Sequence, residues 1–439
     1  MGTDRRWHRL GAAAAGMGVL AAAGCSSSGG QPAGGANSNG PGPTSPAVRP
    51  TTSSAAAGSA SGSPSPADNL AAAAQRVQGD PAQATAAQQA ALRAQHQVIS
   101  HLSARQQAGQ RVIYSYNGLT APAWLLSDIR QGVVGGVIFF SFNISSEPQI
   151  AGVIKQLNGA NASPQNPAHM FPLLLMTDQE GGAVRRLPGA PLQSEAQIGA
   201  SANPAAAAAT AGSSAAANLR GVGMNVNLAP VLDVFRQPGD FDDQFQRSYS
   251  MNPQVAGKAG AAFVTAQQAG GVAATVKHFP GLGPADRTQN TDDAPVSIGS
   301  SAATLRTVDE VPYKAAVRAG VKLAMVSWAN YPALGTRLPA ALAPSIVQGE
   351  LRDRVGFSGV TITDALGAGA LGAYGTLQNR TLLAGRAGMD ALLCTAVKPL
   401  PGWKCVAGLQ QGLQQGALPR GAFQGQLAQL LQLRASLPA

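Results

Sequence analysis

The sequence predicts an α/β protein built on a (β/α)8 TIM barrel. Eight short apolar runs recur along the chain, and helical, mostly Ala-rich segments alternate with them. Apolar runs without polar alternation are typical of parallel strands that are buried on both faces. An open doubly wound sheet is the alternative fold, but no Gly-rich phosphate-binding motif follows the first run.

The expected strands are apolar or β-branched runs, each followed by a polar or Gly-containing turn. They span residues 111–116, 136–142, 172–177, 225–232, 273–276, 323–327, 359–363 and 389–394. Helical periodicity is expected in a segment from Asp68 to Gln107, in 204–219, 255–269, 301–319 and 345–355, and at the C-terminus. One folded domain over 68–439 accommodates all of these segments, and we expect no second globular domain.

The first 24 residues resemble a bacterial lipoprotein signal. Three arginines precede a short apolar run over 10–23, and small residues then lead to a lone Cys25. We expect cleavage before Cys25 and its lipidation, with a plain signal peptide as the alternative. Because the apolar run is too short to span a bilayer, the lipid would hold the protein to the cell membrane on its extracytoplasmic side.

Residues 25–67 have the composition of a flexible tether. They are almost entirely Ser, Gly, Pro, Ala, Thr and Asn, with Arg49 as their only charged residue and no aromatic side chain. The formal charge of +10 falls to +8 without the signal segment, which holds three arginines and one aspartate. This modest basicity suits an anionic cell envelope, and no basic cluster with interleaved aromatics indicates nucleic acid.

Besides Cys25, the chain has two cysteines, Cys394 and Cys405. In an oxidising extracytoplasmic compartment they can pair and close a short loop, and two buried free thiols are the alternative. No His/Cys cluster stands at ligand spacing, so we expect neither a metal nor another cofactor.

Polar residues follow the ends of several expected strands, and in a barrel these ends converge on one face. They are Asp178, Arg185, Arg186, Asp233, Arg247, Lys277, His278, Ser327, Trp328 and Asp364. A single strand-end Asp is as often a helix N-cap as a catalyst. Charged residues at the same end of several strands are harder to explain by capping, so the pattern predicts an active site.

Four segments together resemble glycoside hydrolase family 3, and within it the single-domain β-N-acetylhexosaminidases of the NagZ type. They are Asp178-Gln179-Glu180-Gly181-Gly182, Arg247-Ser248-Tyr249, Lys277-His278-Phe279-Pro280-Gly281 and Ile362-Thr363-Asp364. The resemblance runs from about Ile99 to the end of the barrel. It implies a retaining mechanism, in which Asp364 is the nucleophile and forms a covalent glycosyl-enzyme.

The resemblance also implies which residues bind the hydroxyls of the terminal sugar. They are Asp178, Arg186, Arg247, Lys277 and His278. A carboxylate accepts hydrogen bonds from neighbouring hydroxyls, while Arg and Lys donate to others. Lys277 and Arg247 would also supply positive charge near Asp364 and keep it ionised.

The proton donor departs from the family pattern. NagZ-type enzymes carry a Gly-His-Gly turn and then an Asp-Ser-His segment, whereas here the turn is Gly281-Leu282-Gly283 and no His follows His278. Asn290-Thr291-Asp292 is the best counterpart, so Asp292 is the hypothetical general acid/base, with Asp286 and Asp293 as alternatives. A carboxylate in this role repels anionic acceptors, which favours hydrolysis over phosphorolysis.

Three functions are compatible with these residues. The first is an exo-acting β-N-acetylglucosaminidase for peptidoglycan-derived fragments, and the second is a β-glucosidase, since nothing in the sequence specifies an N-acetyl site. The third is a lipid-anchored sugar-binding protein that has lost catalysis. Because a pure binder needs no nucleophile, the presence of Asp364 favours an enzyme. We expect this enzyme to be a monomer that acts on carbohydrate.

Overall fold

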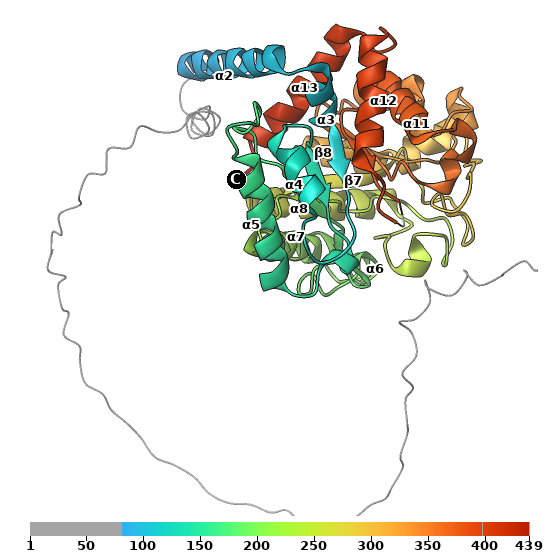
Figure 1. Cartoon of the computed structure of the whole chain (residues 1–439). Coiled ribbons are helices and arrows are strands. Elements are labelled where there is room, and N and C mark those ends of the chain that lie inside the picture. The colour runs from blue at the N-terminus through green and yellow to red at the C-terminus, as the bar shows by residue number, and fades with distance from the viewer. Residues whose placement is uncertain (1–80, 397, 439) are drawn as a thin grey trace, which may run out of the picture. The chain divides into compact units, whose positions relative to one another are not determined.

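The computed structural model describes residues 81–396 and 398–438 (Figure 1). The expected signal over 1–24, Cys25 and the tether over 25–67 lie outside these residues, as does the start of the helical segment from Asp68. Among the described residues, no helix is long and apolar enough to cross a membrane.

All eight expected strands are present in one parallel sheet with the order β10-β1-β2-β3-β6-β7-β8-β9. They are β1 Val112–Tyr114, β2 Gly136–Ile138, β3 Leu174–Thr177, β6 Val226–Asn227, β7 Ala273–Phe279, β8 Leu323–Val326, β9 Val360–Thr363 and β10 Leu392–Cys394. A parallel bridge between Ile362 and Ala391 brings the last two strands together and nearly closes the sheet. The predicted (β/α)8 barrel is therefore confirmed.

A helix follows each barrel strand and covers the outside of the sheet (Figure 1). These helices are α4 Ala123–Arg130, α5 Glu147–Asn161, α7 Pro204–Gly221, α8 Pro253–Ala269, α10 Val311–Arg318, η6 Ser345–Arg354, α11 Leu377–Ala387 and α12 Gly402–Gln414. The other helices are α2 Pro81–His101, α3 Ala104–Gly109, α6 Glu195–Gly199, α9 Ala302–Thr304 and α13 Arg420–Ala435. Short helical turns are η1 Ser141–Asn143, η2 Asp243–Phe245, η3 Leu305–Asp309, η4 Pro332–Leu334, η5 Ala340–Leu342 and η7 Gly369–Tyr374.

Seven of the eight strands are shorter than expected, β6 most of all, whereas β7 is longer. β7 continues to Phe279 rather than ending at Val276, because the main chain of Lys277 bonds to Pro230 and Leu232 and Phe279 pairs with β8. β6 is only two residues long, so most of the expected strand over 225–232 lies outside the regular ladder. The continuation of β7 was not predicted, because the expected strand was defined by its apolar residues and Lys277 and His278 are polar.

A small antiparallel hairpin, which the sequence reading missed, follows β3. It consists of β4 Gln179–Gly181 and β5 Val184–Arg185. Gly181 and Gly182, with φ of 126° and 56°, provide the positive-φ backbone that this tight reversal requires. Glu180, one of the acidic residues that follow β3, lies on this hairpin.

The interior of the barrel is filled by apolar side chains from alternate strand positions, such as Leu174 and Met176 of β3. Leu430 and Leu433 of α13 join the same cluster. The neighbouring Arg434 is buried and donates to the carbonyls of Phe171 and Pro172, which precede β3. Helix α13 therefore covers the end of the barrel at which the strands begin.

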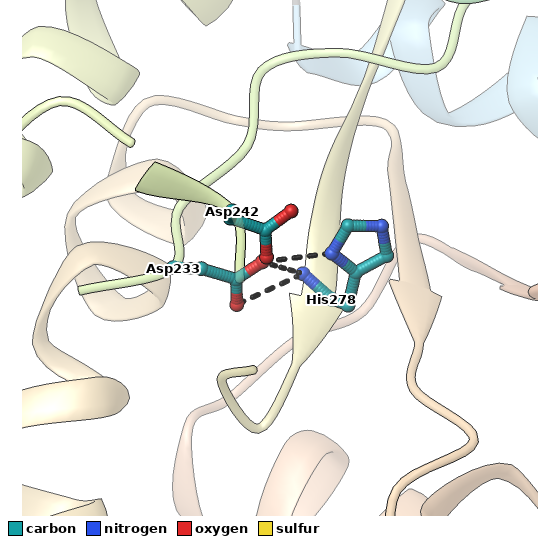
Figure 2. Close-up of side chains that lie close together, drawn as sticks. All are labelled: Asp233, Asp242 and His278. Atoms are coloured by element: carbon teal, nitrogen blue, oxygen red, sulfur yellow. Dashed lines mark hydrogen bonds and ion pairs between the residues drawn. The ribbon is translucent and has the colours of Figure 1, made fainter. Parts of the chain in front are cut away.

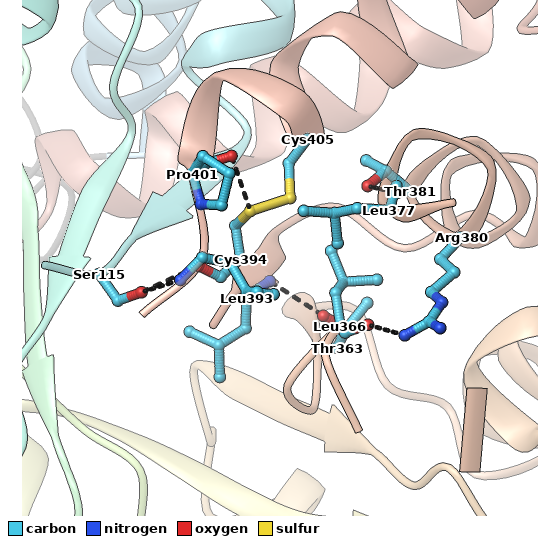
Figure 3. The surroundings of a disulfide bond; sticks show 11 residues. Ser115, Thr363, Leu366, Leu377, Arg380, Thr381, Leu393, Cys394, Pro401 and Cys405 are labelled. Carbon is cyan, nitrogen blue, oxygen red and sulfur yellow. Dashed lines mark hydrogen bonds between the residues drawn. A yellow bond between two sulfur atoms is a disulfide. The ribbon is translucent and has the colours of Figure 1, made fainter. Parts of the chain in front are cut away.

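Cys394, at the end of β10, forms a disulfide with Cys405 of α12 (Figure 3). The segment that follows β9 packs beside this junction, because the main-chain N–H of Leu366 donates to the carbonyl of Leu393. The Thr363 hydroxyl in turn accepts from the N–H of Leu393, at 2.9 Å. The disulfide thus fastens a helix to the strand that supports the segment after Asp364.

Reducing this disulfide should lower the free energy of unfolding by about 2–3 kcal/mol. The reason is that the unfolded chain gains conformational freedom when the loop between Cys394 and Cys405 is no longer closed. Denaturant unfolding of the intact and reduced protein measures the difference. The Cys394→Ala/Cys405→Ala double variant is the companion, since it also removes the buried sulfur atoms. Equal stabilities of the intact and reduced protein, with both thiols shown to be free by labelling, would contradict the expectation.

Candidate active site

A continuous network of charged side chains lies at the end of the barrel opposite α13. The Lys277 ammonium, at the end of β7, is 2.8 Å from Asp178 Oδ1 and 2.7 Å from Glu180 Oε1. On the other side of Glu180, Arg247 Nε lies 2.8 Å from its Oε2. Arg186 Nε lies 3.8 Å from Asp178 Oδ2, at the more exposed edge of the network. Residues after β3, β6 and β7 thus meet at one point.

The network keeps its members charged despite their burial. Burial opposes the carboxylate of Glu180, but Arg247 and Lys277 outweigh it and hold the pKa well below its usual range. Burial likewise opposes charge on Lys277, yet Asp178 and Glu180 raise its pKa. The pKa of Asp178 is lowered by Lys277 and Arg186, again against the effect of burial. The site therefore presents fixed charges that need little rearrangement to meet polar hydroxyls.

His278 is held by a buried carboxylate. Its ring Nδ1 lies 2.7 Å from Asp233 Oδ2, and its main-chain N–H also donates to Asp233 (Figure 2). Burial opposes protonation of the ring, but the negative charge of Asp233 outweighs it and raises the pKa of His278. Because Nδ1 is engaged with Asp233, the ring orientation is fixed and Nε2 is the nitrogen left for a ligand.

Asp242 links the charged network, through Arg247, to the pair formed by His278 and Asp233. Its Oδ1 lies 2.7 Å from Arg247 Nη1, and burial together with the charge of Asp233 raises its pKa to about 6, despite the opposing effect of Arg247. Among the described residues, Asp233, Asp242 and His278 are the one group whose ligand atoms lie close enough to hold a metal, within 4.8 Å of one another. Arg247 already supplies positive charge there, and the negative charge of Asp233 favours protonation of the ring, so we interpret the group as a hydrogen-bonded support for His278.

Asp364 follows β9 at the same end of the barrel. Its Oδ1 accepts from the main-chain N–H of Ala365 at 2.7 Å, and the side chain is half-buried. Trp328, which is buried after β8, donates from its indole to the carbonyl of Ala365 at 2.9 Å. These bonds fix the segment on which the carboxylate stands.

Asp292 lies on the loop that follows β7, and its carboxyl differs from those of the other two candidate acids. Although the residue is accessible at the rim, desolvation by surrounding protein and the negative charge of Asp364 raise its pKa to about 6. Asp286 is exposed, and hydrogen bonds from Thr288 lower its pKa. Asp293 is exposed as well and accepts from the Asn290 amide at 2.8 Å. The raised pKa of its carboxyl thus distinguishes Asp292 from Asp286.

The loops that carry Asp292 and Asp364 are joined through their main chains. The N–H of Gly369 donates to the carbonyl of Asp292 at 2.7 Å, and the N–H of Ala370 donates to that of Thr291 at 3.0 Å. Both donors belong to η7, which begins five residues after Asp364. Main-chain hydrogen bonds therefore hold together the two loops that carry these carboxyl groups.

The structure brings most of the predicted site residues together. Asp178, Arg186, Arg247, Lys277 and His278 form the charged network, and the charges of Asp364, His278 and Arg247 all act on Asp292. Sequence reasoning included Asp233 among the strand-end residues and Glu180 in one of the four family-like segments, but gave neither a specific role. It missed Asp242, which lies in an irregular loop without a motif.

Replacing Glu180 by Gln should lower kcat/KM about 10- to 100-fold, because Lys277 and Arg247 lose the carboxylate that positions them. Breaking a buried ion pair should also lower the free energy of unfolding by about 3 kcal/mol. Steady-state kinetics and denaturant unfolding measure the two effects. Glu350→Gln is the matched control, since Glu350 also bridges two arginines, Arg306 and Arg354, but lies on η6 outside the barrel. Equal effects of the two substitutions on kcat/KM would contradict the assignment.

The chain is similar to several known sequences and structures. Residues 121–433 match the glycosyl hydrolase family 3 N-terminal domain. An uncharacterized secreted glycosyl hydrolase from Arthroderma benhamiae is 45% identical over 334 residues, which are 76% of this chain and 94% of that protein. A β-hexosaminidase from Stenotrophomonas maltophilia is 33% identical over 62% of this chain and 77% of its own length.

A solved structure is similar as well. The glycoside hydrolase family 3 β-N-acetylglucosaminidase from Paenibacillus sp. str. FPU-7 superimposes with a TM-score of 0.70 and 30% identity. The aligned region covers 77% of this chain and 64% of that one. This chain thus spans just under two thirds of that enzyme.

Proposed function

Because this chain belongs to glycosyl hydrolase family 3, we propose that it is a retaining, exo-acting β-N-acetylglucosaminidase with Asp364 as nucleophile and Asp292 as general acid/base. The observation that carries this proposal is the main-chain pairing of the two loops that hold these carboxyl groups. This pairing supports the proposal because it joins the loop of a half-buried carboxylate to the loop of a second carboxyl, whose pKa is raised by desolvation and by the negative charge of Asp364. The names of the bacterial relative and of the similar solved structure support the choice of an N-acetylhexosaminide.

The reaction has two displacements. In the first, Asp364 attacks the anomeric carbon while the protonated Asp292 gives its proton to the glycosidic oxygen, so that the aglycone leaves as an alcohol. In the second, Asp292 takes a proton from water, the water oxygen attacks the anomeric carbon, and Asp364 is released. The sugar keeps its β configuration, and both carboxyl groups return to their starting protonation states.

The charged network would hold the terminal sugar during both steps. Asp178 and Lys277 offer an acceptor and a donor side by side, and Arg186 extends the set toward solvent. Glu180 and Asp242 fix the guanidinium of Arg247, so this cation is already oriented when the sugar arrives. Preorganised groups of this kind reduce the entropy lost on reaching the transition state.

We further propose that the enzyme acts outside the cytoplasm on peptidoglycan-derived fragments. The description of the Arthroderma relative as secreted supports this location, and the N-terminal sequence supports a lipid anchor at Cys25. Metabolic labelling with an alkyne fatty acid and a Cys25→Ala control would test the anchor. Label retained by the Cys25→Ala variant would contradict it.

Initial rates on 4-nitrophenyl β-N-acetylglucosaminide and on 4-nitrophenyl β-glucoside test the substrate class. We expect kcat/KM to be higher for the N-acetylglucosaminide, β anomer as the first product in proton NMR, and no sugar phosphate when phosphate is added. A preference for the glucoside would indicate a β-glucosidase of the same family, and no turnover of either would indicate a sugar-binding protein.

A further inference from the structure

Gly369 occupies the closest point between the two catalytic loops. It begins η7, and its N–H donates to the carbonyl of Asp292. A Cβ atom at this position would lie 2.1 Å from the carbonyl oxygen of Asp293 and 2.4 Å from its carbonyl carbon. Both are main-chain atoms, so no side-chain rotation can relieve the overlap.

Space rather than backbone conformation requires a glycine here. Unlike Gly375 at the end of the same helix, Gly369 does not have a positive φ. Gly372, also within η7, has no atom within 4 Å of where its Cβ would be built. The chain therefore offers two glycines in one helical turn, of which only Gly369 touches the loop of Asp292.

We propose that Gly369 is a positioning residue, whose missing side chain sets the separation of the proton donor Asp292 from the nucleophile Asp364. The inference rests on the proposed function. An added methyl group would push the Asp292 loop away from η7 and weaken two main-chain hydrogen bonds, while Asp364 keeps its own support from Ala365 and Trp328. Proton donation should then suffer more than nucleophilic attack.

Gly369→Ala tests this separation with aryl β-N-acetylglucosaminides of different leaving groups. With 2,4-dinitrophenol, which departs without protonation, kcat/KM should stay within about threefold of the wild type. With phenol, which needs the proton, it should fall about 10- to 100-fold, because a misplacement near 1 Å has effects of this size. Gly372→Ala should match the wild type on both substrates.

The pH profile gives a second readout that a merely structural defect would not move. As Asp292 moves away from Asp364 and toward solvent, its pKa should fall, so the basic limb of kcat/KM should shift to lower pH. Equal losses on both substrates, or no loss on either, would overturn the inference.

A second variant keeps the inference testable if Gly369→Ala does not fold. Ala370→Pro removes the N–H that donates to the Thr291 carbonyl, and proline is tolerated in the first turn of a helix. The same selective loss on the phenyl substrate is expected, and equal losses on both substrates would overturn the inference. A wild-type protein that hydrolyses neither substrate contradicts the proposed function, whereas an active wild type with variants insensitive to the leaving group contradicts only the role of Gly369.

Discussion

Replacing Asp364 by Ala should lower kcat/KM on aryl β-N-acetylglucosaminides on the order of 10⁴-fold or more, because the covalent intermediate cannot form. The substitution leaves a small space beside the anomeric carbon. Azide should enter it and restore part of the activity, and because it attacks from the face that Asp364 occupied, the product should be the α-glycosyl azide. Steady-state rates and NMR of the product measure both effects.

The control for Asp364→Ala is an exposed aspartate outside the site, Asp353 of η6. Asp353→Ala should retain wild-type kinetics. Far-UV circular dichroism and thermal unfolding establish that both variants are folded. Activity of Asp364→Ala within tenfold of the wild type, or formation of a β-glycosyl azide by this variant, would contradict the nucleophile assignment.

Replacing Asp292 by Asn should produce a different pattern. For a phenyl leaving group, kcat/KM should fall about 10²- to 10⁴-fold, because the glycosidic oxygen leaves without a proton. For 2,4-dinitrophenol, kcat/KM should change little but kcat should fall, since water then attacks the glycosyl-enzyme without a general base. Azide needs no base, so it should restore kcat and give the β-glycosyl azide.

The same variant should alter the pH dependence. Asp292 must be protonated for the first displacement, and its pKa is raised to about 6 by desolvation and by Asp364. In the wild type, kcat/KM on the phenyl substrate should therefore fall as pH rises above about 6, by about tenfold for each further pH unit. Asn does not titrate, so this basic limb should be absent in Asp292→Asn.

Asp293→Asn is the matched control for Asp292→Asn, because it removes the adjacent carboxylate of the same loop. Its kinetics and pH profile should resemble the wild type. If Asp292→Asn keeps wild-type turnover and azide rescues nothing, or if Asp293→Asn shows the losses instead, Asp292 is not the acid/base.

The strands of the barrel could be predicted because each is a continuous apolar run, and such runs have few alternatives to a buried parallel sheet. The ends of β6 and β7 were less predictable. Lys277 continues β7 through main-chain bonds with a segment more than 40 positions earlier, which no local pattern reveals. The hairpin over 179–185 depends likewise on glycines whose φ angles only the structure shows.

The candidate site was predictable where its residues directly follow the expected apolar runs, as Asp178, Lys277 and Asp364 do. Asp242 was not, because it reaches Arg247 from an irregular loop. Gly369 was not either, since its importance comes from the approach of two loops that are far apart in the sequence. The sequence favoured Asp292 and kept Asp286 as an alternative, and the structure adds a difference between them, because their pKa values shift in opposite directions.

Trapping the covalent intermediate tests the central claim most directly. A 5-fluoro-N-acetylglucosaminyl fluoride forms the glycosyl-enzyme faster than water releases it, so the intermediate accumulates. Intact-mass spectrometry should show one added sugar per chain, and peptide mapping should place it on Asp364. No adduct under conditions in which aryl N-acetylglucosaminides are hydrolysed, or an adduct on any other residue, would contradict a retaining mechanism through Asp364.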